Sequence, residues 1–577
     1  MSRTNRNTLL AGTAMRSKPI FILSIVLILV LALIATASAE KKWTIMVYCC
    51  ADNNLDEAGV NDLNELELSG SDENLNIIFL LDRWGNFDTH LYYVEHDPDG
   101  LPGGNDNNTI STIIDDSAPW LAVEEDMGNP ATLQDFVIWS MQNYPAEHYL
   151  LSIWDHGSGI FKDGGLFPTK GECWDDNGGD PNDYIDLAEL KSVMSAAKNS
   201  IGRKLDIVGH DVCVAGQYET HYQMRDYADI SIASADNEPM EGWDYHNPFV
   251  NLKNDPLMTP TELANQIVYY YWLWYGPDPH CCNTMAAVDL GLMTSDFMPV
   301  FENFCDVLVQ NFNDCPDLLR AARNDCASYN FPNFDLWNYA EFLTGQEYPV
   351  AVQNAAAGLI SALETMFINH KVGLYSNGTG CTIWFPSKYS LDGNVEQYEN
   401  QIDFANTGWP RFLRVFAGEF IINTQSLPDA YVNSAYYQEF TAFNGTAPYH
   451  WEKVTGQYPY GMTFRDGSTA NISGTPTYAA TFGFTLRVTD SSEPPLQDEK
   501  RFYITVNDPL PIRGDADGSG KVDITDAVFL VNYIFLDGLE PDPMILGDAN
   551  CDGTVNLVDV IYLINYVFRS GPPPCEF

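Results

Sequence analysis

Basic side chains are scarce in this chain of 577 residues, which holds 29 Lys and Arg against 79 Asp and Glu. The formal net charge of −50 argues against a surface that binds nucleic acid or anionic lipid. The same charge attracts cations, including calcium and basic peptides. Aromatic residues make up 13% of the chain, which argues against disorder and favours packed domains.

Long hydrophobic runs are also lacking beyond the N-terminus. Four basic residues precede an apolar run over 20–35, and Ala37-Ser38-Ala39 fits a cleavage site. These features predict a signal peptide over 1–39 and a secreted or cell-surface product, with an uncleaved anchor as the alternative. No later stretch is long enough to cross a bilayer.

Zinc-type spacing is absent, because the 12 cysteines form no CxxC pair and no His/Cys array. Export permits disulfides instead. Cys551 and Cys575 are one candidate pair, although their pairing does not follow from the sequence alone. One or two further bridges are expected within a second group, which comprises Cys281, Cys282, Cys305, Cys315 and Cys326.

Strand-like and helix-like runs alternate from residue 41 to about 418. The strand candidates are apolar along their length, as buried parallel strands are, and span 43–50, 76–83, 149–157, 205–213 and 230–235. Helix candidates between them include 56–68, 132–143 and 186–199. This pattern predicts an α/β domain with a mostly parallel sheet between helices.

The pattern changes between residues 424 and 508, where short β-like runs alternate with turn clusters. The spacing predicts a small antiparallel β-sandwich. The segments GTAPYHW (445–451), ISGTP (472–476) and FTLRVTD (484–490) resemble bacterial Ig-like or cadherin-like repeats, which implies a spacer or a weak binding unit. Prolines in 507–515 predict a short linker to the next module.

Two repeats close the chain, GDADGSGKVDITD from Gly514 and GDANCDGTVNLVD from Gly547. Each has an oxygen donor at loop positions 1, 3, 5, 7, 9 and 12 and Gly at position 6, which predicts two Ca²⁺ sites. The first set is Asp515, Asp517, Ser519, Lys521 (through its carbonyl), Asp523 and Asp526. The second set is Asp548, Asn550, Asp552, Thr554 (through its carbonyl), Asn556 and Asp559.

Asp at position 12, an apolar helix after each loop and no helix before it resemble a type I dockerin. The resemblance implies a small α-helical module that docks to a cohesin-type scaffold or cell-surface protein. It also places Ile524, Thr525, Leu557 and Val558 where partner recognition is usual. The apolar Leu557 and Val558 are alternatively packing residues.

Two strand ends carry chemistry. His156 follows YLLSIWD and precedes Gly157, and Cys213 follows LDIVGHDV. The carboxyl ends of parallel strands share one edge of a sheet, which brings functional groups together there. A thiolate is a nucleophile that an imidazole can activate, and backbone N–H groups near Cys213 and Gly157 suit an oxyanion. The alternatives are a buried structural cysteine and a structural histidine.

Cys49 and Cys50 end the first strand and are rival nucleophiles, but no glycine-rich turn follows them. Four sequence blocks help to choose between these possible nucleophiles. In order along the chain they are WTIMVYCCADNNLD (43–56), WDHGSG (154–159), HDVCVAGQYE (210–219) and IASADNEPMEGWDY (232–245). Together they resemble the clostripain-like cysteine peptidases, which are related to caspases and gingipains.

The resemblance implies a caspase-like fold in which His156 is the general acid/base and Cys213 the nucleophile. Asp211 matches the acid linked to Arg or Lys at P1, and its alternative role is a loop carboxylate. Val212, Val214 and Ala215 depart from the usual pattern, which weakens the P1 assignment but leaves the dyad intact. Family members often cut themselves between these strands, which makes Lys170-Gly171 the candidate cut.

The same loop carries Asp175, Asp176, Asp180 and Asp183, which are either calcium ligands or solvated side chains. The predicted division is 1–39 signal peptide, 40–420 peptidase, 421–508 Ig-like sandwich and 509–577 dockerin. The predicted function is a secreted cysteine endopeptidase that acts on protein or peptide substrates. The alternatives are a non-catalytic scaffold with a degenerate peptidase domain and a component of a polysaccharide-degrading complex.

Overall fold

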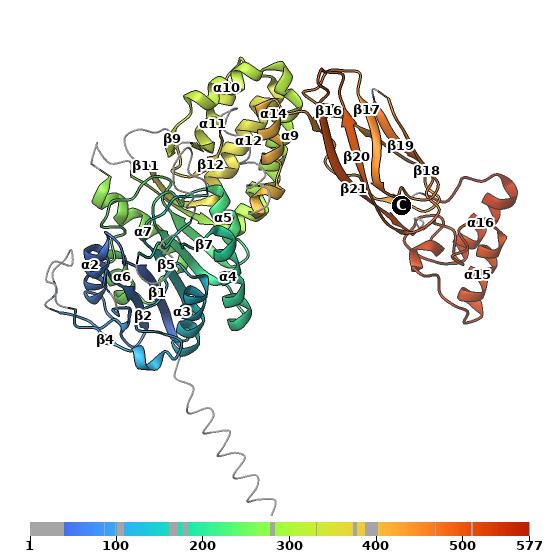
Figure 1. The fold of residues 1–577 in the computed structure, drawn as a ribbon. Helices are drawn as coiled ribbons and strands as arrows, with labels where there is room; N and C mark the ends of the chain where they lie inside the picture. Colours follow the sequence, from blue (N-terminus) through green and yellow to red (C-terminus); the bar gives the residue numbers. More distant parts are fainter. Residues whose placement is uncertain are drawn as a thin grey trace, which may run out of the picture. The chain divides into compact units, whose positions relative to one another are not determined.

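The computed structural model describes residues 40–575, with gaps at 86, 99, 101–108, 161–170, 177–182, 277–282, 331, 373–377, 387–397, 399–401, 468 and 509–511. The chain divides into two compact units, Met1–Ala417 and Gly418–Phe577 (Figure 1). The predicted signal peptide and the Lys170 cut therefore lie outside the described residues. None of the described helices is both long and apolar enough to cross a membrane.

A nine-stranded sheet forms the centre of the first unit, in the order β11-β8-β7-β6-β5-β1-β2-β3-β4. Its five inner strands are parallel: β1 (Lys41–Cys50), β2 (Leu75–Asp82), β5 (Ala146–Trp154), β6 (Leu205–Asp211) and β7 (Ala228–Ala233). Its outer strands are antiparallel: β3 (His90–Tyr93), β4 (Thr112–Ile113), β8 (Thr284–Asp289) and β11 (Phe367–Val372). The predicted α/β class is confirmed.

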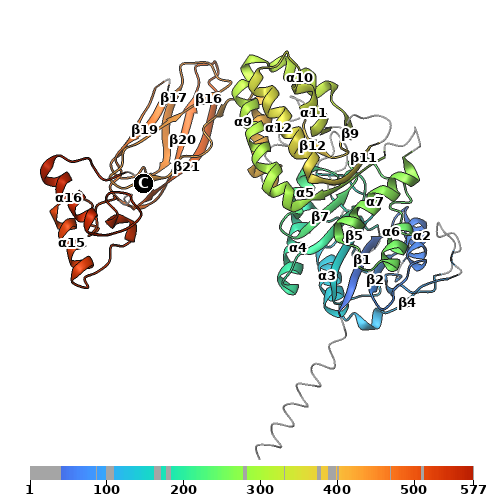
Figure 2. The same cartoon turned by 180° about the vertical axis from the view of Figure 1, so that it is seen from behind.

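Helices lie on both faces of this sheet (Figures 1 and 2). One face packs a large apolar core with α2 (Asp56–Glu67), α6 (Asn247–Asn254) and α7 (Pro260–Tyr275). Three further helices are α3 (Pro130–Asn143), α4 (Leu187–Ile201) and α5 (Tyr218–Met224). Tyr48 of β1 packs on Phe136 of α3, with ring centroids 5.8 Å apart.

The unit ends in a helical region that includes a small three-stranded sheet of β9 (Ser328–Asn330), β10 (Asn333–Asp335) and β12 (Thr382–Trp384). Its helices are α8 (Leu290–Leu292), α9 (Met298–Asn311), α10 (Pro316–Asp325), α11 (Leu336–Leu343), α12 (Val350–Met366) and α14 (Trp409–Ala417). Gln217, next to α5, forms a β-bridge with Thr382, which ties this region to the end of β6.

The second unit begins with short sheets around a shared apolar core that includes Phe440, Trp451 and Ile504. One sheet contains β14 (Ala430–Tyr431), β17 (His450–Gly456), β20 (Ala480–Thr489) and β21 (Gln497–Asn507). The others contain β13 (Ile421–Ile422), β15 (Tyr436–Phe440), β16 (Ala442–Phe443), β18 (Met462–Arg465) and β19 (Ala470–Gly474). Helices α15 (Ile524–Phe535) and α16 (Leu557–Arg569) follow and pack on each other through Leu530 and Leu563.

Candidate functional site

The site lies where β5 and β6 end. These strands pair in parallel with Trp154 opposite Asp211, and the N–H of Asp155 donates to the carbonyl of Asp211 at 3.3 Å. His156 and Cys213 each follow two residues after this pair. Both therefore leave the sheet at the same edge and at corresponding positions. β1 lies beside β5, so the chain order reverses there, as at ligand-binding crevices of open α/β sheets.

Cys213 is partly exposed, in contrast to the other described free cysteines, which are buried. Its Sγ accepts from the backbone N–H of Glu238 at 3.2 Å. Burial raises the pKa of the Cys213 thiol, and hydrogen bonds from the backbone of Glu238 and Gly157 counteract that rise. Because these donors favour the thiolate, they prepare the sulfur for nucleophilic attack.

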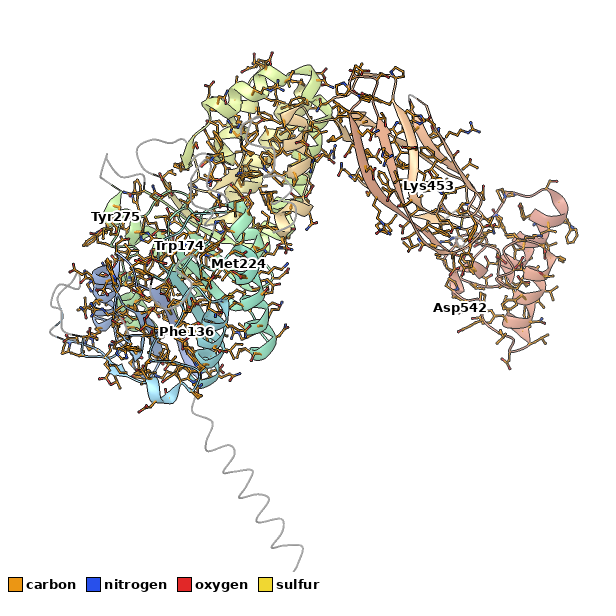
Figure 3. The ribbon with its side chains drawn as sticks, in the orientation of Figure 1. Phe136, Trp174, Met224, Tyr275, Lys453 and Asp542 are labelled. Atoms are coloured by element: carbon orange, nitrogen blue, oxygen red, sulfur yellow. A yellow bond between two sulfur atoms is a disulfide. The ribbon has the colours of Figure 1, made fainter. Side chains whose placement is uncertain are left out.

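His156 is held from two sides. Its Nε2 lies 3.0 Å from Oδ1 of Asn54, and its ring centroid lies 6.4 Å from that of Trp174. Burial lowers the pKa of His156, and the negative charge of Asp176 acts in the opposite direction. A neutral imidazole at pH 7 is therefore available as a base. Figure 3 labels Trp174 among the side chains of the first unit.

Gly157 leaves no room for a side chain. A Cβ atom there would lie 2.2 Å from the carbonyl oxygen of Cys213 and 2.8 Å from Cγ2 of Val212. The loop after β5 therefore approaches the Cys213 backbone closely only because residue 157 is glycine.

Asp211, the last residue of β6, is buried two residues before Cys213. Its Oδ2 accepts from the N–H of Trp243 at 3.2 Å, and its side chain interacts with that of Glu238. Burial raises the pKa of both carboxyl groups, and the Asp211 charge raises the pKa of Glu238 further. Each carboxyl group therefore disfavours ionisation of the other.

An acidic hollow lies close to Asp211. The carboxylates Asp62, Glu65, Glu241 and Asp244 line it, together with the aromatic residues Trp243, Trp274 and Tyr275. The charges of Asp211 and Glu241 both raise the pKa of Tyr275, which shows that they share one electrostatic environment. Carboxylates beside aromatic faces suit a cationic side chain. A separate hollow borders Cys213 itself and is lined by Glu172, Tyr184 and Ala215, among others.

The rival nucleophiles are enclosed. Cys49 and Cys50 are 0% and 1% exposed, and burial raises the pKa of both thiols well above its usual value. Neither reaches substrate. One or two bridges were expected within a group of five cysteines, and this expectation is wrong for Cys305, Cys315 and Cys326, which are free thiols packed in the apolar interior. Cys281 and Cys282 lie outside the described residues, and Cys551–Cys575 is a disulfide.

Sequence reasoning missed three contributors to this site, Asn54, Trp174 and Glu238. Asn54 follows β1, 102 residues before His156, and Trp174 lies further along the same connection between β5 and α4 as His156. Asn54 lies in the first of the four sequence blocks that resemble the clostripain-like peptidases, and Glu238 lies in the last. Their place in these blocks is the sequence signal that could have identified both residues.

The first calcium loop has ligand geometry. Carboxylate oxygens of Asp515, Asp517 and Asp526 lie within 4.8 Å of one another. Gly520, at position 6, has φ of +83°, and its N–H donates to Asp515 at 2.7 Å. This oxygen set around a left-handed glycine fits Ca²⁺. The remaining predicted ligands of this loop are Ser519, Lys521 and Asp523.

The second loop repeats this backbone pattern, with Gly553 at φ +85° donating to Asp548 at 3.1 Å. It carries Asn550 and Asn556 where the first loop has aspartates, so it has fewer negatively charged ligands. Its other predicted ligands are Asp552, Thr554 and Asp559. Nη1 of Arg513 lies 3.1 Å from Asp548 and further reduces its charge. Leu557 and Val558 are about half exposed, which removes packing as their role.

Family models match three consecutive segments. The model described as "Clostripain family" covers residues 47–405, "Putative Ig domain" covers 419–507 and "Dockerin type I domain" covers 513–568. The chain belongs to the clostripain family. This is a family of cysteine endopeptidases, and the two further modules match the predicted Ig-like and dockerin segments.

Clostripain of Hathewaya histolytica is 31% identical over 233 residues, which cover 37% of this chain and 43% of that protein. The chain therefore matches less than half the length of this relative. An inactive zymogen C11 protease from Parabacteroides distasonis aligns with 15% identity and a TM-score of 0.47, over 65% of this chain and 99% of the other. A secreted C11 cysteine protease from Bacteroides thetaiotaomicron aligns with 17% identity and a TM-score of 0.47, over 64% and 99%.

Proposed function

We propose that this protein is a secreted cysteine endopeptidase in which Cys213 is the nucleophile and His156 the general acid/base. The observation that carries this proposal is the pairing of β5 with β6, which puts both residues at one sheet edge. Two further observations support it: Cys213 is partly exposed, and burial lowers the pKa of His156, which favours the neutral ring that a base needs.

The reaction follows from these groups. His156 removes the thiol proton as Cys213 Sγ attacks the peptide carbonyl carbon, and the carbonyl electron pair moves to oxygen. Backbone N–H groups near Gly157 and Cys213 stabilise that oxyanion. His156 then protonates the leaving amine as the C–N bond breaks. Water, deprotonated by His156, hydrolyses the resulting thioester and restores the thiol.

Cys213→Ala tests the nucleophile. We expect it to abolish cleavage of Arg- or Lys-containing peptides and labelling by a thiol-reactive P1-Arg probe. Cys49→Ala is the matched control, since Cys49 also ends a parallel strand but is enclosed, and it should keep both activities. Undiminished cleavage by Cys213→Ala would contradict the assignment.

The acidic surroundings support a preference for Arg or Lys at P1, with Asp211 as the main contact and Glu238 beside it. We expect Asp211→Asn to lower kcat/KM for a P1-Arg peptide by about 10- to 100-fold, the loss of one hydrogen bond to a charged group. A P1-norleucine peptide should change far less. Equal losses on the two peptides would remove Asp211 from specificity.

The C-terminal module supports a docking function. With Ca²⁺ bound by its two loops, the dockerin would attach the peptidase to a cohesin-type scaffold or cell-surface protein. The exposed Ile524, Leu557 and Val558 are the proposed contact residues, together with Thr525. The proposed division is 40–420 peptidase, 421–508 spacer and 509–577 dockerin, after removal of 1–39. Maturation would cut Lys170-Gly171, which mass spectrometry of the secreted product tests.

A further inference from the structure

Two cysteines other than the candidate nucleophile lie against each other in the interior of the first unit. Cys50 ends β1, and Cys173 lies in the connection between β5 and α4. Their thiols are hydrogen-bond partners. Cysteines whose side chains point apart cannot be bridged, so this contact meets the first condition for a disulfide.

Hydrogen bonds that do not involve the thiols join the two segments, 50–53 and 173–176. Nδ2 of Asn53 donates to the carbonyl oxygen of Trp174 at 3.2 Å, and the same amide donates to the carbonyl oxygen of Cys50 at 3.1 Å. The N–H of Asp176 donates to the carbonyl oxygen of Asp52 at 3.1 Å. The surrounding chain therefore brings the two thiols to one place.

Cys49 adjoins Cys50 in the sequence but lies on the other face of the sheet, because successive side chains of a strand alternate. The Cys49 sulfur is on the side of α2, where a Cβ added at Gly59 would lie 2.8 Å from it. Cys50 shares the face of Tyr48, which packs on α3. The strand thus presents Cys50 rather than Cys49 to Cys173.

The backbone at Cys173 is constrained. Its φ is +63°, in the left-handed region that favours glycine, so a cysteine is kept there at a conformational cost. Glu172 on one side forms a β-bridge with Gly157. Trp174 on the other side donates through its N–H to Asp155. The flanking residues therefore impose the conformation that turns this thiol toward the end of β1.

We propose that Cys50 and Cys173 are joined by a disulfide in the exported protein. Disulfides persist in oxidising surroundings outside the cell, and the same chain carries the Cys551–Cys575 disulfide. The inference rests on the proposed export of the chain and not on the proposed catalytic dyad.

The bond forms by exchange with a disulfide oxidant, either a small molecule or a protein. One cysteine thiolate attacks the oxidant, which releases one of its sulfurs as a thiol. The second cysteine thiolate then attacks the mixed disulfide and releases the other. The two cysteines lose two protons and two electrons, and the oxidant is reduced to two thiols.

Burial determines when the bond can form and break. Cys50 and Cys173 are 1% and 0% exposed, so an oxidant reaches them only before the peptidase unit has folded around them. A reductant is excluded from the folded unit for the same reason, whereas the partly exposed Cys213 stays within its reach. The unit can therefore hold an oxidised pair and a reduced nucleophile together.

Peptide mapping tests the bond directly. The full chain with Cys213→Ala, which prevents self-cleavage, is directed to an oxidising bacterial periplasm, unfolded with an alkylating reagent and no reductant, and digested. Mass spectrometry should find the peptides of Cys50 and Cys173 joined, two hydrogen atoms lighter than the reduced peptides together, and Cys305 alkylated. Alkylation of both Cys50 and Cys173 would overturn the proposal, as would a bond from Cys49 to Cys173.

Matched variants identify the partner and measure its effect. Cys50→Ala should expose Cys173 to alkylation, whereas Cys49→Ala, an equally buried change in the same strand, should leave the bond intact. Cys50→Ala should also melt several degrees below Cys49→Ala, because the bond closes a long loop, and refolding in reductant should remove this difference. Tryptophan fluorescence follows the peptidase unit, since every tryptophan except Trp451 lies before residue 418. Equal melting before reduction would overturn a stabilising bond.

Electrophoresis of the chain with Cys213 intact separates this inference from the proposed maturation. A cut at Lys170-Gly171 puts Cys50 and Cys173 on different fragments, so the product should run as one band without reductant and as two bands with it. Two bands without reductant would overturn the bond. A single band under both conditions would reject the cut and leave the mapped bond standing.

Discussion

His156 determines the acid limit of the proposed reaction. Burial holds its pKa below the usual value, and Asp176 opposes this shift. The base form is needed, so the acid limb of the kcat/KM profile should lie below about 6.5, the ordinary pKa of histidine. Asp176→Asn removes a negative charge that favours the protonated His156 ring. The substitution should therefore move the acid limb of the kcat/KM profile to lower pH by about half a unit. A pH profile of kcat/KM measures the shift, and an upward shift would contradict it.

Gly157 sets how closely the two catalytic loops approach. Gly157→Ala should destabilise the peptidase unit by about 1–3 kcal/mol, as overpacking does, and abolish most activity. Gly358→Ala is the control, because the nearest atom to its added Cβ is Cγ1 of Val300 at 3.8 Å. Gly358 lies in helix α12, so its replacement by alanine should raise the free energy of unfolding of the peptidase unit by about 0.5–1 kcal/mol. Chemical denaturation and peptide cleavage compare the two, and equal stability would reject the close-approach argument.

At the scale of elements, the two calcium loops differ in charge while sharing a backbone. The first has four predicted aspartate ligands and the second three, and Arg513 lies against the position-1 aspartate of the second. The first loop should therefore bind Ca²⁺ about tenfold more tightly, since affinity follows ligand charge. Calorimetric titration of Asp526→Ala and Asp559→Ala chains isolates each loop, and equal affinities would contradict this ranking.

The parallel strands were predictable because they are buried on both faces and therefore apolar throughout. The predicted segments 43–50 and 230–235 match β1 and β7 within two residues at each end. His156 and Cys213 were predictable because strand ends share an edge. Asn54, Trp174 and Glu238 were not, since loop folding rather than periodicity brings them to that edge.

At the scale of the whole molecule, the net charge of −50 should act on encounter with substrate. Electrostatic attraction accelerates association of opposite charges, and salt screens it over about 10 Å at 0.1 M. The kcat/KM for a basic protein substrate should therefore fall about tenfold between 0.05 and 0.5 M NaCl. That for an uncharged peptide ester should change little. Stopped assays at both salt concentrations measure kcat/KM for the two substrates. Equal changes for both substrates would exclude electrostatic attraction of the basic one.

The position-12 aspartates of the calcium loops already have hydrogen-bond partners within the protein. Asp526 accepts from the N–H groups of Asp517 and Asp523 and so closes its loop and caps α15, and Asp559 does the same for α16. The loops thus keep part of their shape when calcium is scarce. If the peptidase unit cuts after basic residues, as proposed, a docking module that stays folded keeps the exposed Lys521 from becoming a site of self-digestion.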